Sequence, residues 1–194
     1  TKAMSIEEAV GLSNEVTEED LANAWEDEFG VKYSPDGKRL LRCENEYLQE
    51  YAIREGVVVI CNEAFDPCWE LQNIQIPNGV ICIGDGTFQD CNLLQDVVLP
   101  DSVIIVGIRA FSGCNALQTI KMPVGVASIG EKAFEDCRSL KSINLPETIT
   151  EIGDGAFLNC DLTPNIATPN FFSDDICLFD RTGQRLISCH RQDV

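Results

Sequence analysis

The sequence predicts an α/β solenoid, in which short repeated units stack on one another to form a single elongated domain. Three residue types recur every 23 residues, five times each. They are Cys68, Cys91, Cys114, Cys137 and Cys160; Phe65, Phe88, Phe111, Phe134 and Phe157; and Pro77, Pro100, Pro123, Pro146 and Pro169. Self-similarity at a fixed period of this length is the signature of stacked repeat architectures. A chain of 194 residues is consistent with one such domain.

Each coil is expected to contain two short strands and a one-turn helix. A Val-x-x-Ile strand ends at a glycine, an Ala-Phe-x-x-Cys segment shares one helical face, and a Leu-x-x-Ile-x-Leu strand ends before a proline. One coil buries apolar side chains worth roughly 15 kcal/mol, whereas ordering its backbone costs about 1–2 kcal/mol per residue. A single coil should therefore not fold alone, and stacking is required. The five coils are 54–76, 77–99, 100–122, 123–145 and 146–168.

This pattern, Leu-Pro-x-x-Val-x-x-Ile-Gly-x-x-Ala-Phe-x-x-Cys-x-x-Leu-x-x-Ile, resembles the BspA-like (treponemal-type) leucine-rich repeat family over residues 54–169. The resemblance implies a right-handed leucine-rich repeat solenoid. It also implies a bacterial cell-surface or secreted protein that attaches to proteins of a host or of neighbouring cells. The sequence departs from the pattern at Arg54, Cys61, Thr87, Thr163 and Thr168.

Segments on both sides of the repeats are expected to cap the open ends of the solenoid, as repeat proteins require. Residues 31–43 and 177–189 align with each other, and each places a glycine, Gly37 or Gly183, between two alternating apolar arms. Both read as β-hairpins. The predicted divisions are 1–30, an acidic helical segment; 31–53, a capping hairpin and lead-in; 54–169, the solenoid; and 170–194, a second capping hairpin and tail.

Two helices are predicted ahead of the first hairpin. Ser5 with Glu8 forms a capping-box start for the first helix, and Thr17 with Asp20 forms a weaker start for the second. The second helix is expected to carry an apolar stripe that must pack on something. The stripe consists of Leu21, Trp25 and Phe29.

The sequence offers a target on the solenoid for the predicted N-terminal helices. The two middle positions of the first strand should point away from the core, and in the first three coils they are apolar. They are Val58 and Val59, Ile81 and Cys82, and Ile104 and Ile105. We expect the helices to cover this patch; a homodimer interface is the rival interpretation and an exposed ligand patch is the third.

The repeating cysteines read as buried core thiols, because a free cysteine packs as a small hydrophobe. Zinc sites need closely spaced Cys and His ligands, which the sequence lacks, and equivalent side chains of stacked coils run parallel, which suits disulfide geometry badly. His190 is the only histidine. Cys43 and Cys189 occupy matching hairpin positions, which leaves a pairing between them open. The cysteines outside the set that repeats every 23 residues are Cys43, Cys61, Cys82, Cys177 and Cys189.

The charge of the chain argues against partners that need a basic surface. It carries 32 acidic and 14 basic side chains, a formal net charge of −18. Nucleic acids and anionic membranes are therefore not expected as partners. Residues 1–28 alone hold nine acidic and one basic side chain, but they lack the order of a calcium loop, which favours a solvated helix face. No run of 18 apolar residues predicts a membrane span.

No catalytic constellation is visible, so we expect neither an enzyme nor a bound metal or cofactor. The outward positions of the Leu-x-x-Ile-x-Leu strands form the expected protein-binding surface. The alternative interpretation is that these side chains are simply solvated and bind no partner. Besides adhesion, an intracellular scaffold or regulatory protein is the alternative function, because ten cysteines suggest a reducing compartment; an enzyme is third. The surface residues are Asn73, Gln75, Asp96, Val98, Thr119, Lys121, Ser142 and Asn144.

Overall fold

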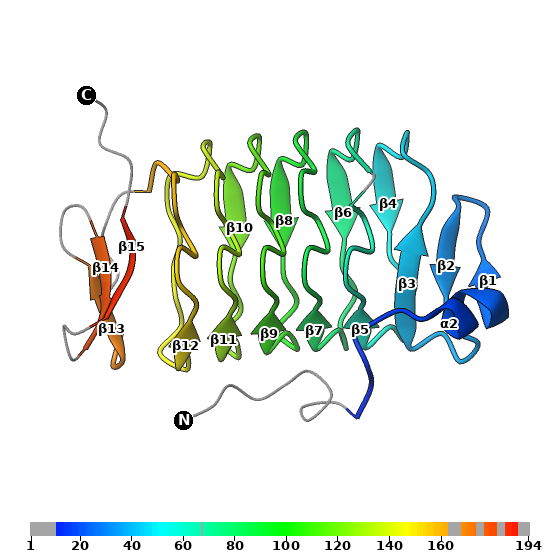
Figure 1. Cartoon of the computed structure of the whole chain (residues 1–194), viewed down its shortest axis with the longest axis horizontal. Helices are drawn as coiled ribbons and strands as arrows, with labels where there is room; N and C mark the ends of the chain where they lie inside the picture. Colours follow the sequence, from blue (N-terminus) through cyan, green and yellow to red (C-terminus); the bar gives the residue numbers. More distant parts are fainter. Residues whose placement is uncertain (1–10, 67, 163–167, 174–176, 182–184, 190–194) are drawn as a thin grey trace.

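The computed structural model describes residues 11–66, 68–162, 168–173, 177–181 and 185–189, without the side chains of Phe179, Ser188 and Cys189. The chain forms an elongated solenoid of about five turns, in which one strand from every coil lines up along one edge (Figure 1). The helix expected from Ser5, the turn at Gly183, Thr163 and His190 lie outside the described residues.

The first strands of all five coils build one parallel sheet, as predicted. Neighbouring strands pair at a register of 23 residues, so that Val59 lies opposite Cys82 and Cys82 lies opposite Ile105. An antiparallel unit at the N-terminal end extends this sheet. The strand order is β1 (Trp25–Glu26), β2 (Val31–Tyr33), β3 (Arg39–Cys43), β5 (Val59–Ile60), β7 (Cys82–Ile83), β9 (Ile105–Val106), β11 (Ser128–Ile129) and β12 (Glu151–Ile152).

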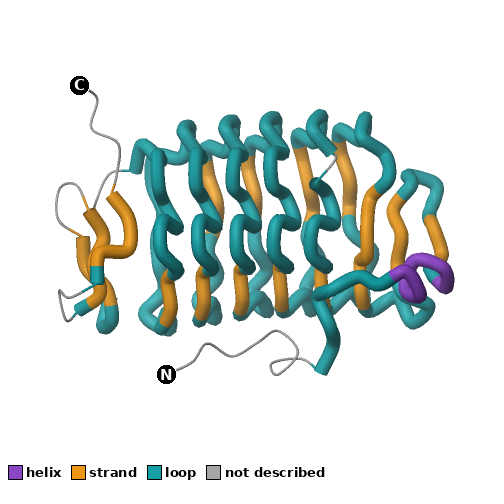
Figure 2. Tube along the Cα trace, in the orientation of Figure 1, coloured by secondary structure: helices purple, strands orange, loops and turns teal. Residues whose placement is uncertain are grey.

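The second strands form a shorter parallel sheet on another side of the solenoid (Figure 2). Its strands are β10 (Thr119–Lys121), β8 (Asp96–Val98), β6 (Asn73–Gln75) and β4 (Glu50–Ala52), each with a buried middle residue and two exposed neighbours. Strand β4 extends the repeat backwards into the predicted lead-in, with Tyr51 opposite Ile74.

The second strand predicted for the fourth coil is absent. Residues 142–144 form no strand, and their central residue Ile143 is only partly buried, whereas Val97 and Ile120 are almost fully enclosed. The second strand of this coil therefore packs more weakly on the core, and the second sheet ends at β10.

The one-turn helix predicted for each coil is wrong, because the segment between the two strands consists of turns. Glu63, Asp90 and Arg109 adopt positive φ angles of 56°, 58° and 53°, which a right-handed helix does not allow. The backbone N–H groups alternate between partners in this segment. That of Phe65 donates to Thr87 of the next coil, whereas that of Ala64 donates to Cys61 three residues earlier. Bonds between coils therefore replace the bonds within a helix.

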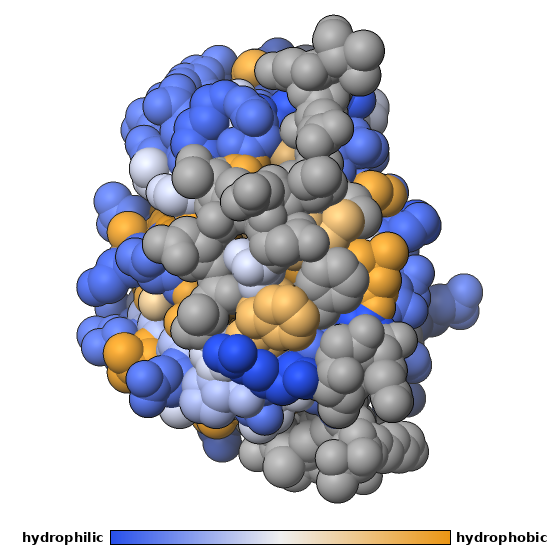
Figure 3. Space-filling view, turned by 90° about the vertical axis from the view of Figure 1, so that its left-hand side faces the viewer, coloured by the Kyte–Doolittle hydropathy of each residue, from blue (hydrophilic) through white to orange (hydrophobic). Residues whose placement is uncertain are grey.

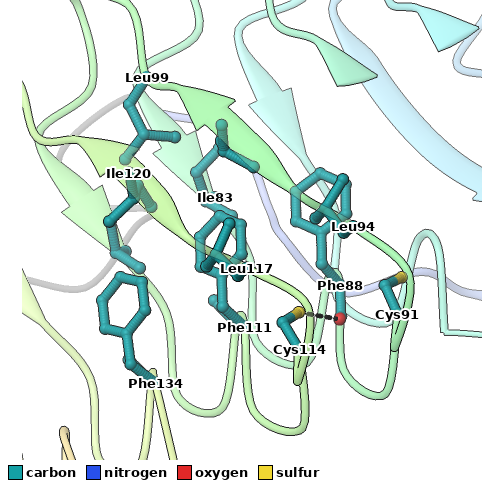
Figure 4. Packing of buried hydrophobic residues seen from close by; sticks show 14 of the residues in the cluster. Ile83, Phe88, Cys91, Leu94, Leu99, Phe111, Cys114, Leu117, Ile120 and Phe134 are labelled. Atoms are coloured by element: carbon teal, nitrogen blue, oxygen red, sulfur yellow. Dashed lines mark hydrogen bonds between the residues drawn. The ribbon is translucent and has the colours of Figure 1, made fainter. Parts of the chain in front are cut away.

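A ladder of stacked phenylalanines fills the centre of the solenoid. Neighbouring rings lie nearly parallel, with centroids 5.2 Å apart for Phe88 and Phe111 and 5.3 Å apart for Phe111 and Phe134. The thiol of Cys114 donates to the backbone carbonyl of Phe88 at 3.2 Å (Figure 4). Offset aromatic stacking and burial together make such rings large contributors to core stability.

A third, antiparallel sheet lies at the C-terminal end. It consists of β13 (Phe171–Ser173), β14 (Cys177–Asp180) and β15 (Leu186–Cys189), in that order. The β14–β15 pair corresponds to the predicted hairpin, and β13 is an additional strand. The backbone N–H of Gly155 in the last coil donates to the carbonyl of Ile187, and the side chain of Ile187 joins the core. Seen from this end, the described surface is mostly hydrophilic, with scattered hydrophobic side chains (Figure 3).

The predicted second helix begins where expected but is much shorter. Helix α2 (Glu18–Asn23) starts with a capping box between Thr17 and Asp20. Trp25 then enters strand β1 and stacks on Tyr33, with ring centroids 4.7 Å apart. The continuous helical stripe from Leu21 through Trp25 to Phe29 is therefore wrong, because packing on the hairpin overrides the local helical pattern.

Candidate binding surfaces

The outer face of the second sheet presents the predicted polar residues in an ordered array. Asn73, Gln75, Asp96, Val98, Thr119 and Lys121 are all exposed on β6, β8 and β10. Side chains on neighbouring strands are bonded: the Thr119 hydroxyl donates to Asp96 Oδ1 at 2.7 Å, and Asn73 Nδ2 donates to Glu50 Oε1 at 3.3 Å. Ser142 and Asn144 are exposed but lie outside the sheet.

Exposed apolar side chains beside this face were missed by the sequence reasoning. Tyr47, Trp69 and Leu93 are 69%, 55% and 44% exposed. They lie in the turns that precede β4, β6 and β8, and Tyr47 and Leu93 hold the same repeat position two coils apart. Aromatic side chains of this kind often dominate the energy of protein interfaces. For Tyr47 and Leu93, the signal in the sequence is an apolar residue at the repeat position that Glu70 occupies in the coil between them.

The apolar patch on the first sheet is largely enclosed by the N-terminal strap, which we define as residues 11–24. Val59 and Cys82 are fully buried and Ile105 nearly so, whereas Ile104 remains exposed. Val58 and Ile81 are partly buried at the edge of the same cluster. The strap residues that pack against the cluster are Leu12, Val16, Leu21 and Ala24.

Polar contacts hold the strap in place. Arg39 donates from Nε to the carbonyl of Ser13 at 2.9 Å and pairs with Asp20 Oδ1 at 2.8 Å. The Asn62 backbone N–H donates to the carbonyl of Asn14 at 2.8 Å, and the two asparagine side chains bond to each other. The guanidinium of Arg39 lowers the pKa of Asp20 to about 2. Within the strap, Glu18–Asn23 form helix α2, and the other residues have no regular secondary structure.

A groove with a volume of about 660 Å³ continues along the outer face of the first sheet beyond the strap. It lies over β9, β11 and β12, between Glu15 of the strap and Arg185 of the C-terminal sheet. The Arg185 guanidinium donates to Asp154 Oδ1 at 2.8 Å and to the carbonyl of Ile152 at 3.1 Å.

The repeating thiols form part of the core. Cys91, Cys114, Cys137 and Cys160 each donate to the carbonyl of the phenylalanine 26 residues earlier, at distances from 3.4 to 2.9 Å. Burial raises the pKa of Cys114 and of Cys137 well above the usual thiol value. Such thiols form little thiolate and are poor nucleophiles and metal ligands. Among the described residues, no cluster of three or more His, Cys, Asp or Glu side chains is arranged to hold a metal ion.

The cysteines outside the repeating set differ in redox state. Cys43 is a free, buried thiol, so the pairing with Cys189 that the sequence leaves open is not formed. Cys61 and Cys82 are also free and buried, and burial raises their pKa values to about 11 and about 12. Cys177, in contrast, is disulfide-bonded, and Cys189 lies opposite it across the β14–β15 pair. The disulfide at Cys177 does not fit the interpretation that the ten cysteines indicate a reducing compartment.

Comparisons with known proteins agree with this architecture. Residues 43–174 match the BspA type Leucine rich repeat region in six copies. A search of curated proteins finds no match. Within the described residues, no helix is both long and apolar enough to cross a membrane.

Three bacterial crystal structures resemble the chain. A leucine-rich repeat protein from Bacteroides ovatus ATCC 8483 is 34% identical over 71% of this chain and 37% of its own, with a TM-score of 0.58. A T. pallidum leucine-rich repeat protein is 30% identical over 70% and 67%, with a TM-score of 0.64. A leucine rich cell surface protein from Faecalibacterium prausnitzii A2-165 is 29% identical over 86% and 42%, with a TM-score of 0.69. The chain thus spans less than half the length of two of them.

Proposed function

Because the chain belongs to the BspA type leucine-rich repeat family, we propose that it is a non-catalytic protein-interaction module that serves in adhesion at the bacterial cell surface or after secretion. Its partner is a protein on a host or neighbouring cell. The observation that carries this proposal is the outer face of the second sheet, which no other segment among the described residues covers. There, rows of exposed polar side chains on neighbouring strands lie beside the exposed aromatic residues Tyr47 and Trp69.

The chemistry of this surface fits protein recognition. The hydrogen bonds from Thr119 to Asp96 and from Asn73 to Glu50 hold the polar rows in one arrangement, which reduces the side-chain entropy lost on binding. Tyr47 and Trp69 add apolar area at the margin of the rows. Protein interfaces combine aromatic residues with polar side chains, and this surface offers both.

A location outside the cytosol is supported by two observations. Cys177 is disulfide-bonded, and disulfides persist mainly in oxidising compartments. One structural relative is described as a cell surface protein. The second candidate function, an intracellular scaffold or regulatory protein, is favoured by eight free buried cysteines. Burial protects those thiols from oxidation, so they are compatible with either compartment.

The end segments serve this function by closing the solenoid. We assign the capping role to residues 31–53 and to the sheet β13–β15, on the bond from Gly155 to Ile187 and the burial of Phe171 and Leu178 in the core. A closed solenoid presents its sides, rather than its apolar ends, to partners.

Protease treatment of intact bacteria that express the protein tests the proposed location. An antibody against residues 31–162 follows the chain, with a cytosolic protein as the control. We expect the chain to be degraded, or to be found in the medium, while the cytosolic control stays intact. Retention of the undegraded chain within unbroken cells would contradict the adhesion proposal and favour the scaffold.

A further inference from the structure

The outer face of the first sheet is divided into two parts. The N-terminal strap covers the part over β3, β5 and β7, where Val59 and Cys82 are fully buried. The groove of about 660 Å³ occupies the part over β9, β11 and β12, a volume typical of binding pockets. Asn14 and Glu15 of the strap also line the groove.

The strap shows how this face binds a segment without regular secondary structure. Apolar side chains such as Leu12 and Val16 pack on the sheet, while backbone carbonyls of the strap accept hydrogen bonds from the solenoid. The Arg39 guanidinium binds the carbonyl of Ser13, and the Asn62 N–H binds the carbonyl of Asn14. The face therefore supplies both an apolar floor and donors that recognise a peptide backbone.

The groove keeps an apolar floor at its strap end and becomes acidic farther on. Ile105 and Ile108 line the end next to the strap. Two coils after Ile105 the same repeat position is Glu151, and one coil after Ile108 the same position is Glu131. Among the described residues, Arg185 is the one basic residue that lines the groove, and it is already paired with Asp154.

We propose that the groove binds an extended, basic segment of a partner protein beside the strap. An aliphatic side chain of the segment packs on Ile105 and Ile108, and a lysine or arginine pairs with Glu131 and Glu151. Strands in a parallel sheet lie about 4.8 Å apart and extended chain rises about 3.3 Å per residue, so about three residues cross from β9 to β12.

Charge complementarity selects this occupant. In the part of the chain that the structure describes, the acidic side chains that line the groove are Glu15, Asp85, Glu131 and Glu151, against Arg185. A second copy of the chain is disfavoured because each copy carries a net charge of −18. This site is separate from the face of the second sheet, and it holds whether or not the protein serves in adhesion.

Peptide selection on the full chain tests the proposal. Phage that display random octapeptides are selected on the immobilised chain, with an excess of the soluble double variant Glu131→Lys/Glu151→Lys as competitor to remove clones that bind elsewhere. The recovered peptides are expected to combine lysine or arginine with an aliphatic residue. Selection of acidic or uncharged peptides, or recovery of no binding clone, overturns the proposal.

A matched control separates the groove from the overall charge. The double variant Asp101→Lys/Glu147→Lys changes the net charge equally at exposed turns outside the groove. The affinity of a synthetic selected peptide, measured by fluorescence anisotropy, should fall at least tenfold for the groove variant and less than twofold for the control. Circular dichroism confirms that both variants are folded.

Two further results would overturn the proposal. One is an equal loss of affinity in the groove and control variants, which would indicate attraction to the net charge alone. The other is a concentration-dependent dimer, seen by size-exclusion chromatography with light scattering, that the groove variant dissociates. That dimer would identify a second copy as the occupant.

Discussion

The outer faces of the two parallel sheets are built by the same 23-residue coil. The strap partly covers the outer face of the first sheet, whereas the outer face of the second sheet, which we call the bare face, is exposed. On the first sheet, Val59 and Cys82 are buried beneath the N-terminal strap. On the second sheet, the corresponding outward residues, such as Asn73 and Asp96, are exposed and polar. The inward residues of both sheets share one core. The repeat therefore specifies the inside of the solenoid, whereas the surroundings of each face decide what its outer positions do.

The largest effect is expected from a residue on which both faces depend. Phe111 is fully buried and lies between the rings of Phe88 and Phe134. Phe111→Ala should lower the free energy of unfolding by about 3–5 kcal/mol, because a large side chain is lost from a site that cannot collapse fully. Urea unfolding followed by circular dichroism measures the change. Val124→Ala, at an exposed turn, is the control and should change stability by less than about 0.5 kcal/mol.

Loss of the Arg39 contacts that hold the strap should affect only the outer face of the first sheet. Arg39→Ala removes the bonds to the carbonyl of Ser13 and to Asp20, which should cost about 1.5–3 kcal/mol because charged groups are involved. Hydrogen exchange should then accelerate at the Asn62 amide, which donates to the strap, and remain slow at Ile74 in the second sheet. Equal acceleration at both amides would show that the strap and the second face are not independent.

The same contact predicts a dependence of strap stability on pH. The pKa of Asp20 is lowered from 3.8 to about 2, mainly by its hydrogen bond to Arg39. A carboxyl group with a lowered pKa in the folded state stabilises that state above its unfolded pKa, and this contribution is lost as pH falls from about 4 to about 2. Exchange at the Asn62 amide, corrected for its intrinsic pH dependence, should accelerate over this range. In Asp20→Asn that acceleration should be absent; its persistence would assign the effect to another group.

The smallest effect is expected from residues of the bare face. Gln75→Ala and Thr119→Ala remove exposed side chains, and each should change the free energy of unfolding by less than about 0.5 kcal/mol. Chemical denaturation is the measurement. A loss above 1 kcal/mol from either substitution would mean that this face has a structural role, contrary to the comparison of the two sheets.

Much of the fold could be predicted because the core repeats. The period of Phe65 through Phe157 gave the stacking register, and the predicted strands appear wherever buried residues keep that period. The turns between the strands were misread as helix, because the helical spacing of Ala133, Phe134 and Cys137 suits a tight turn equally well. The positive φ angle of Lys132 rules out the helix. Its mark in the sequence is a glycine at the same repeat position in two other coils, Gly86 and Gly155, which also have positive φ angles.

Features that depend on contacts between distant segments could not be predicted. Strand β4 was missed because Asn45 replaces the repeating cysteine, and Tyr47 lay outside the predicted coils for the same reason. The departures at Arg54 and Cys61 make sense only in three dimensions. Arg54 lies over the Trp25 ring at 5.0 Å, and the Cys61 thiol lies beneath the strap, 4.0 Å from the carbonyl of Ser13.

The groove was likewise invisible in the sequence, because the strap and Arg185 form its two ends. The outward positions of the second sheet, in contrast, follow from strict alternation along each strand. For this reason Asn73, Gln75, Asp96, Val98, Thr119 and Lys121 could be named in advance, whereas Ser142 and Asn144 were placed in a strand that the fourth coil does not form.

The most direct test of the central claim is whether soluble chain inhibits attachment of the expressing bacteria to immobilised host-cell surface proteins. Three proteins are compared: the unmodified chain, the double variant Tyr47→Ala/Trp69→Ala beside the bare face, and Leu186→Ala, which removes a similarly exposed apolar side chain from the C-terminal sheet. We expect the unmodified chain and Leu186→Ala to inhibit equally, and the double variant to require at least a tenfold higher concentration. Equal inhibition by all three proteins, or none by the unmodified chain, would contradict the claim that the bare face of the second sheet binds the partner.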